Sequence, residues 1–316
     1  MNKLKLLVIV GPTAVGKSKL AVQIAKKING EIVSADSMQV YKKMNIATAK
    51  LSMADQMGIA HHLVDCVNLN SNFSVVDYVK MARRSLKEIV AKNKRPILVG
   101  GTGLYVDSLL NEFEFDEREN CEKIRANLME EFEKHGAVYM FEKLKKIDFN
   151  YANKLHPNNF RRVIRALEVF YSTGRTMSDK VKLNKEKTNS FECLKIGLNF
   201  LDRQKLYSKI NNRIDFMLEQ GLLKEANEIF TLSDGNCKCT AMQAIGYKEF
   251  VDFFLGKENL DDAVLKLKKN TRHLAKRQLT WFKRDKEINW FFVDEIKEIQ
   301  LFNKIMNFVN SFFNLV

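Results

Sequence analysis

Residues 4–18, LKLLVIVGPTAVGKS, join a short apolar run to a glycine-containing loop. The run Leu4–Val10 is apolar at all but one position, as is typical of a strand buried on both faces of a parallel sheet. The segment Gly11–Ser18 has the spacing Gly-x-x-x-x-Gly-Lys-Ser, in which backbone N–H groups and a helix N-terminus surround phosphate oxygens. We therefore predict that this segment binds a phosphate or a diphosphate.

The loop also supplies a cation and a hydroxyl. Lys17 would neutralise phosphate charge and Ser18 could ligate Mg²⁺. A nucleoside triphosphatase would add a carboxylate at the end of an apolar strand. The strand predicted at 96–101 ends in glycines instead, and we interpret Asp294 as a structural strand end. A phosphate site is thus better supported than an ATP site. The predicted diphosphate-binding residues are Gly11, Pro12, Thr13, Ala14, Val15, Gly16, Lys17 and Ser18.

Strand and helix patterns alternate through the first third of the chain. Apolar runs at 31–36, 61–66 and 95–100 are separated by helical periodicity, including a helix that Ser74 can cap. This alternation is typical of an α/β fold with a parallel sheet, here a P-loop NTPase-like core.

A long helical segment interrupts this pattern. From about Asp116 to Glu192 the apolar spacing is helical throughout, and an apolar run at 193–200 predicts a return strand. We therefore predict a core formed by residues 1–115 and 193–316, with an all-helical insertion at 116–192.

Basic residues are concentrated in two places. The 316 residues contain 52 Lys and Arg against 38 Asp and Glu, a formal net charge of +14. Most of this excess lies between Asn158 and Lys187, in the insertion, and between Lys266 and Lys286. Localised positive charge of this kind favours a polyanionic partner such as nucleic acid.

The remaining composition predicts a cytoplasmic protein. Five scattered cysteines argue against a disulfide framework. The apolar start continues into the phosphate loop, unlike a signal peptide, and no apolar run reaches the roughly 20 residues that a membrane span needs.

Two polar residues follow predicted strands. Asp36 ends the strand at 31–36, and Thr102 follows the strand at 95–100. Functional residues of open α/β sheets collect at this edge, where Asp36 could orient or deprotonate an acceptor. Either residue could instead cap the turn or helix that follows it.

Eight segments together resemble the tRNA dimethylallyltransferase family, also called tRNA isopentenyltransferases. They occur in family order and cover most of the chain: GPTAVGKS (11–18), SADSMQVYKKMNIATAK (34–50), HHLVD (61–65), GGTGLY (100–105), HPNNFRRVIRALEVFYSTGR (156–175), LYSKINNRIDFMLEQGLLKEA (206–226), AIGYKE (244–249) and TRHLAKRQLTWFKRD (271–285).

The resemblance implies transfer of a dimethylallyl group from dimethylallyl diphosphate to N6 of the adenosine 3′-adjacent to the anticodon in tRNA. It implies Mg²⁺ as cofactor, and the anticodon stem-loop of tRNA and dimethylallyl diphosphate as partners of a monomeric enzyme. Asp36 would accept from the adenine amine, Thr102 would position the reacting groups, and Lys17 and Arg213 would neutralise the leaving diphosphate.

The resemblance also implies a set of tRNA contacts in the core and in the insertion. The pattern departs from the family at Asn159 and Arg161, where Asp and Gln are usual, and at Ala47 and Leu51. The implied tRNA-binding residues are Asp36, Ser37, Met38, Gln39, Thr102, Arg125, Arg161, Arg162, Val163, Ile164, Arg165, Gln243, Ala244, Ile245, Gly246, Tyr247 and Lys248.

Alternative functions remain open from the residues alone. An isopentenyltransferase for free adenine nucleotides, or a P-loop small-molecule kinase, would explain the phosphate loop and Asp36 but neither basic stretch. A non-catalytic RNA-binding protein would not need Lys17, Ser18, Asp36 and Thr102 together.

Overall fold

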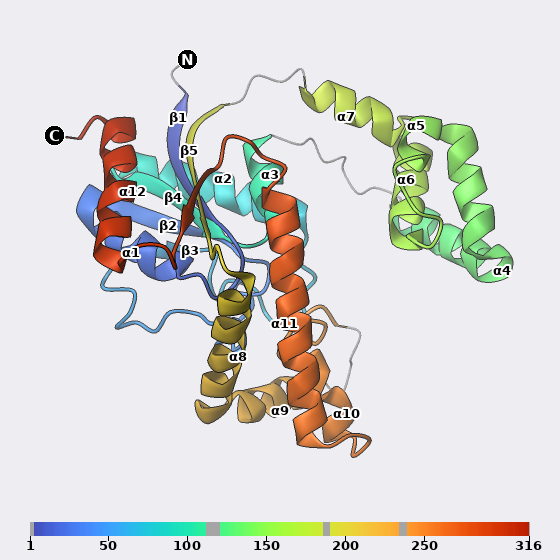
Figure 1. The fold of residues 1–316 in the computed structure, drawn as a ribbon. Coiled ribbons are helices and arrows are strands. Elements are labelled where there is room, and N and C mark those ends of the chain that lie inside the picture. The colour runs from blue at the N-terminus through green and yellow to red at the C-terminus, as the bar shows by residue number, and fades with distance from the viewer. Residues whose placement is uncertain (1–2, 112–120, 186–189, 234–238, 316) are drawn as a thin grey trace. The chain divides into compact units, whose positions relative to one another are not determined.

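The computed structural model describes residues 3–111, 121–185, 190–233 and 239–315 (Figure 1). The chain divides into two compact units, a core of Met1–Leu110 with Ser190–Val316, and a helical unit of Asn111–Asn189. The boundary predicted between residues 115 and 116 lies outside the described residues. The boundary predicted at 192/193 falls inside a strand, because Phe191 and Glu192 already pair with Leu4 and Lys5.

The described part of the core contains a six-stranded parallel sheet. Its order is β3-β2-β4-β1-β5-β6, and each neighbouring pair runs in the same direction. The predicted α/β class is therefore confirmed. The strands are β1 (Leu4–Val10), β2 (Gly30–Ala35), β3 (His61–His62), β4 (Arg95–Gly100), β5 (Phe191–Asn199) and β6 (Asn289–Phe292).

Strand β3 is shorter than the apolar run at 61–66 predicted. Leu63 and Asp65 have φ angles of 61° and 53°, and such left-handed residues end an extended segment. The carboxylate of Asp294 is structural, as interpreted above, because it accepts hydrogen bonds from the backbone N–H groups of Leu201 and Asp202 at 2.7 and 3.2 Å.

Helices cover both faces of the sheet. Side chains of Leu7 and Ile9 pack in the cluster that includes α1 and α12, whereas α2 and α3 contact β2 and β4 from outside that cluster. Helix α11 contacts α8 and α3 (Figure 1). The core helices are α1 (Lys17–Ile28), α2 (Val75–Ala91), α3 (Gly103–Leu110), α8 (Arg203–Glu219), α9 (Leu222–Leu232), α10 (Val251–Phe254), α11 (Leu260–Phe282) and α12 (Glu298–Phe313), with a 3₁₀ turn at Lys248–Phe250.

The helical unit has its own apolar core. Leu128 and Leu144 of α4 pack against Val163 and Leu167 of α6. Helix α4 is kinked at Gly136, whose φ of 79° is left-handed. The helices are α4 (Cys121–Ile147), α5 (Phe149–Ala152), α6 (Phe160–Thr173) and α7 (Met177–Lys185). In the described residues of both units, we find no helix with the length and apolarity needed to cross a bilayer.

Candidate active site

The phosphate loop connects β1 to α1, as the sequence predicts. Gly11 has a φ of 141°, and a Cβ there would lie 2.3 Å from the carbonyl oxygen of Leu198 in β5. Gly16 has a φ of 88° and immediately precedes α1, so the loop turns into the helix through a left-handed residue. Both glycines are therefore required by backbone geometry.

Three charged residues influence one another beside this loop. The Nζ of Lys17 donates to the carbonyl oxygen of Pro12 at 2.7 Å. Burial lowers the pKa of Lys17 to about 8; Asp36 opposes this shift, and Arg213 adds to it. Burial also lowers the pKa of Arg213, while Asp36 again acts in the opposite direction. The fold thus brings together three residues that are far apart in the sequence.

Asp36 lies directly after β2 and caps the turn that follows. Its Oδ1 accepts from the backbone N–H groups of Met38 at 2.9 Å and Gln39 at 3.4 Å. The capping role considered above is therefore present. Within the described part of the chain no donor bonds to Oδ2, so this oxygen can still accept from a substrate.

Thr102 follows β4 and lies beside the Asp36 turn. Its Oγ1 accepts from the backbone N–H of Ser37 at 3.0 Å, and its own N–H donates to the carbonyl oxygen of Ala35 at 3.0 Å. These bonds hold the ends of two adjacent strands together. Thr102 and Asp36 therefore share one edge of the sheet, as expected for functional residues of this fold class.

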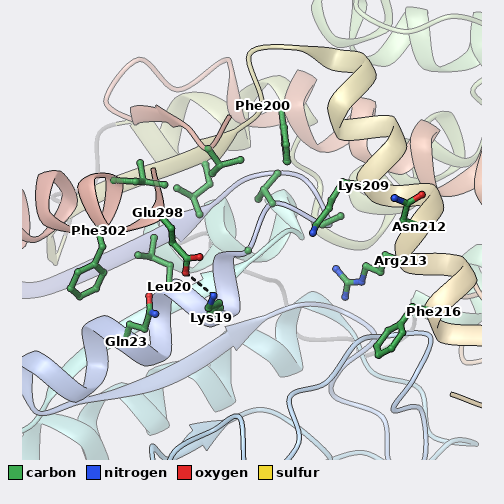
Figure 2. Close-up of a pocket in the computed structure, with 16 residues that line it drawn as sticks. Lys19, Leu20, Gln23, Phe200, Lys209, Asn212, Arg213, Phe216, Glu298 and Phe302 are labelled. Atoms are coloured by element: carbon green, nitrogen blue, oxygen red, sulfur yellow. Dashed lines mark ion pairs between the residues drawn. The ribbon is translucent and has the colours of Figure 1, made fainter. Parts of the chain in front are cut away.

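A cavity of about 620 Å³ opens beside the phosphate loop (Figure 2). Lys209 and Arg213 line it from α8, together with Asn212 and the loop residues 14–16. The rest of its wall is largely apolar, so one cavity offers cations and backbone N–H groups next to hydrocarbon. The apolar lining residues are Leu20, Leu198, Phe200, Phe216, Val293, Leu301 and Phe302.

An ion pair lies at the rim of this cavity. Lys19 of α1 and Glu298 of α12 approach to 2.7 Å, and both side chains are exposed (Figure 2). An exposed pair of this kind contributes little to stability.

Sequence reasoning missed a glutamine that joins two parts of the site. The side chain of Gln278, in α11, accepts from the N–H of Thr13 and donates to the carbonyl oxygen of Gly101. A signal was available, because Gln278 lies four residues after Leu274 and three before Trp281, on the helix face that these apolar residues define.

Several predicted tRNA-binding residues of the core have their side chains occupied or buried. The amide of Gln39 accepts from Ser34 and donates to the carbonyl oxygen of Thr48. Ala244, Gly246 and Tyr247 are buried, whereas Gln243 and Lys248 are exposed and Ile245 is half-buried. Side-chain contact with RNA from this segment is thus restricted to its exposed positions.

A buried carboxylate that the sequence did not reveal orders the same region. Glu225 of α9 accepts from the backbone N–H groups of Asn45, Ile46 and Ala47 at 2.9–3.1 Å, and from the hydroxyl of Tyr247 at 2.8 Å. Burial and the Glu225 carboxylate raise the pKa of Tyr247, so its hydroxyl stays a donor. Glu225 therefore ties the loop after the Asp36 turn to the segment 243–248.

The basic stretch of the helical unit needs a similar correction. Val163 and Ile164 are buried in the core of that unit, so their side chains are not available to RNA. The arginines Arg161, Arg162 and Arg165 are exposed. The exposed arginines thus form one charged face of α6, and the opposite face packs into the core of the helical unit.

A buried acid in the same helix interacts with two of the predicted RNA-binding arginines. The carboxylate of Glu168 lies 3.1 Å from Arg165 and 4.0 Å from Arg125, and both arginines are more than half exposed. The fold therefore places Arg125 of α4 next to the basic stretch of α6.

The fold and the loop define a class of protein, and comparison with known proteins identifies the family. A parallel sheet with a Gly-x-x-x-x-Gly-Lys-Ser loop after its first strand and a carboxylate at a nearby strand end defines a P-loop-like α/β protein. A family model described as IPP transferase matches residues 39–285, and the chain belongs to this family.

Relatives match over nearly the whole length. The chain is 46% identical to a tRNA dimethylallyltransferase of Thermoanaerobacter sp. (strain X514), covering 95% of this chain and 96% of that one. It is 40% identical in sequence to a tRNA isopentenylpyrophosphate transferase from Bacillus halodurans whose crystal structure is known. The two structures give a TM-score of 0.74, covering 98% of this chain and 97% of that one. A eukaryotic dimethylallyltransferase acting on tRNA gives a TM-score of 0.81 at 29% identity, covering 98% of this chain and 78% of that one.

Proposed function

We propose that this chain transfers a dimethylallyl group from dimethylallyl diphosphate to N6 of the adenosine 3′-adjacent to the anticodon in tRNA, releasing diphosphate. Prenylation of tRNA follows from the family and from relatives at 40% identity and above. The single observation that supports the finer proposal is the site itself. Lys17, Asp36 and Arg213 interact beside a cavity that has Lys209 and Arg213 of α8 next to the phosphate loop and a wall that is otherwise largely apolar.

The shape of this cavity matches the chemistry of the proposed donor. The loop at 14–16 and Arg213 line the cavity and, together with adjacent Lys17, would surround the diphosphate, while the apolar wall would accept the five-carbon chain. A nucleoside triphosphate would need a site for a base and ribose, and the site residues described above give no reason to propose one. The relatives named above are tRNA enzymes, so they support neither the kinase nor the free-nucleotide alternative.

In the proposed reaction, the lone pair of adenine N6 attacks C1 of the dimethylallyl group. The bond between C1 and the diphosphate oxygen breaks, and its electron pair leaves with the diphosphate. Lys17 and Arg213 would stabilise the charge that develops there. The N6 proton passes to Asp36, whose Oδ2 has no intramolecular donor in the described residues. The adenine must leave its base stack to reach this carboxylate.

Magnesium fits the chemistry of the loop. In the described residues no group of three or more His, Cys, Asp or Glu side chains could hold a metal ion. Mg²⁺ is commonly held by one or two protein ligands together with phosphate oxygens and water. The Ser18 hydroxyl, in the first turn of α1, would supply such a ligand, and the ion would neutralise diphosphate charge.

Labelled dimethylallyl diphosphate and Mg²⁺ test the proposal, with unmodified tRNA and AMP offered separately. We expect label only in tRNA, at one adenosine that nuclease mapping places 3′ to the anticodon. Labelling of AMP, or consumption of ATP without either product, would contradict the proposal.

A carboxylate variant tests the proposed proton acceptor. Asp36→Asn should abolish transfer while tRNA binding is retained, because the amide preserves the turn but cannot take the proton. Asp55→Asn is the control, since Asp55 is exposed and its hydrogen bonds among the described residues are to nearby Ser52. Full activity of Asp36→Asn would refute the acid–base role. The cytoplasmic location and the monomeric state remain predictions.

A further inference from the structure

Helix α11 reaches into the site through the side chain of Gln278. Its Oε1 accepts from the backbone N–H of Thr13 at 2.9 Å, and its Nε2 donates to the carbonyl oxygen of Gly101 at 3.1 Å. Thr13 belongs to the phosphate loop, and Gly101 directly precedes Thr102. One planar amide therefore connects the loop proposed to hold the donor to the strand end that carries Thr102.

The two glycines near Thr102 allow this approach. A Cβ on Gly101 would lie 2.3 Å from Nε2 of Gln278, and a Cβ on Gly103 would lie 2.2 Å from the ring of Trp281. The φ angles of both glycines are outside the left-handed region, so the need here is for space and not for backbone freedom. The residue pattern GGTG and the helix α11 are thus complementary in shape.

A second bond fixes the helix next to the glutamine. The Nε1 of Trp281 donates to Oδ2 of Asp107 in α3 at 2.8 Å. Because Gln278 and Trp281 lie one helical turn apart, α11 is attached at neighbouring points to the loop, to the residue that follows β4 and to α3. Because α11 is fixed in this way, Gln278 cannot move with the phosphate loop alone or with the end of β4 alone.

We propose that Gln278 is a positioning residue for the transfer reaction, holding the phosphate loop and the Thr102 strand end at a fixed separation. The inference rests on the proposed function, in which the donor binds at the loop and the acceptor nitrogen arrives at the Asp36–Thr102 edge. The reacting atoms come from these two sides, so their alignment depends on this spacing. Misplacement by about 1 Å can cost on the order of a hundredfold in rate.

Two variants that disturb the bridge from opposite sides test this role. Gln278→Met keeps an unbranched side chain of similar length but removes both hydrogen bonds. Gly101→Ala does not change residue 278, but the added Cβ would push the amide of Gln278 out of its position. We expect each to lower kcat for tRNA prenylation about ten- to a hundredfold. The dissociation constant for tRNA should stay within about twofold of the original, because no tRNA contact is assigned to either residue.

The control is Thr280→Ala on the same helix. Thr280 is exposed, and in the described part of the chain its hydroxyl bonds to the carbonyl oxygen of Lys276 within the same helix, so kcat should remain unchanged. Melting temperature separates positioning from unfolding. A purely structural role would lower stability and tRNA binding together, which would overturn the inference, as would unchanged kcat in both bridge variants. A parent enzyme that fails to label tRNA would overturn the proposed function instead.

Discussion

Replacing Glu225 with glutamine would remove the charge that organises the loop after Asp36. The carboxylate accepts hydrogen bonds from the three backbone N–H groups of residues 45–47 and from the Tyr247 hydroxyl. Glu225 is buried, with an exposed fraction of 9%. Glutamine has almost the same shape but one acceptor oxygen. If its oxygen takes the place of Oε1, its NH₂ group faces the N–H of Asn45, which then has no acceptor.

The magnitude follows from this local rearrangement. An unsatisfied buried donor costs about 1–3 kcal/mol, and loss of charge weakens the remaining bonds, so we expect a loss of about 2–4 kcal/mol in the free energy of unfolding. For a unit of this size, each kcal/mol corresponds to roughly 2–4 °C in melting temperature. The variant should therefore melt about 4–16 °C below the parent protein.

The assay combines thermal and urea unfolding with steady-state kinetics. Glu228→Gln is a matched control. It makes the same chemical change in α9, three residues after Glu225, at an exposed position. Exposed substitutions of this kind stay within about 0.5 kcal/mol of the parent. KM for tRNA should rise in Glu225→Gln more than KM for the donor, because Glu225 contacts the acceptor-side segments and not the phosphate loop.

Equal melting temperatures for Glu225→Gln and Glu228→Gln would refute this reasoning. Tyr247→Phe provides an internal scale, since it removes one of the donors and leaves the three backbone bonds in place. Its effect should therefore be the smaller one, about 1 kcal/mol.

Three further predictions follow from the charged groups. The pKa of Lys17 is about 8, so kcat/KM for the donor should fall as the pH rises through 8, and Lys17→Arg should flatten that decline in a pH–rate profile. Burial alone would raise the pKa of Glu31, but its ion pairs with Lys94, His62 and Lys92 prevail and lower it to about 2. Its stabilising contribution is therefore complete above pH 4.5 and is lost as the pH falls towards 2. Urea unfolding should show that Glu31→Gln is less stable than the parent near neutral pH and that this difference in the free energy of unfolding shrinks in acid. Neutralising the exposed arginines of α6 together should weaken tRNA binding and reduce the slope of log Kd against log salt in filter-binding titrations; these arginines are Arg161, Arg162 and Arg165.

Each of these predictions has a contradicting outcome. A donor kcat/KM that is flat between pH 7 and 9 (about one unit either side of the Lys17 pKa) would remove Lys17 as the titrating group. A constant stability difference between Glu31→Gln and the parent across the acid range would show that the Glu31 ion pairs have no net effect. An unchanged salt slope would mean that α6 does not contact phosphates.

Some elements could be predicted because the information for them is local. The loop Gly11–Ser18 is defined by residues within one strand–turn–helix segment, and two of its three positive-φ positions, Gly11 and Gly16, are glycines, the third being Ala14 with a φ of 68°. The capping box formed by Ser74 and Asp77 lies within four residues, and Ser74 was predicted as a cap. The positions of Asp36 and Thr102 followed from one general property of parallel sheets, the common edge at which strands end.

Other residues were misjudged because a segment was considered as a whole. The stretch Arg161–Arg165 was assigned to tRNA, although the helical spacing of Val163 and Leu167 already predicted that one face is buried. Gly101 was considered only as part of a strand that ends in glycines, whereas it provides space for Gln278. In both cases the role of the residue depends on which of its sides packs against another element, and a sequence motif does not contain that information.

The sequence by itself determined the parallel α/β core, the phosphate loop, the helical insertion and the two strand-end residues, because each depends on neighbours along the chain. Only the tertiary structure revealed the bridging role of Gln278 and the four donors around Glu225. Gln278 contacts a residue 265 positions away, and Glu225 contacts backbone about 180 positions away. Polar bonds of this kind leave no periodic pattern, because any buried donor can be satisfied by whichever acceptor the folded chain brings within about 3 Å.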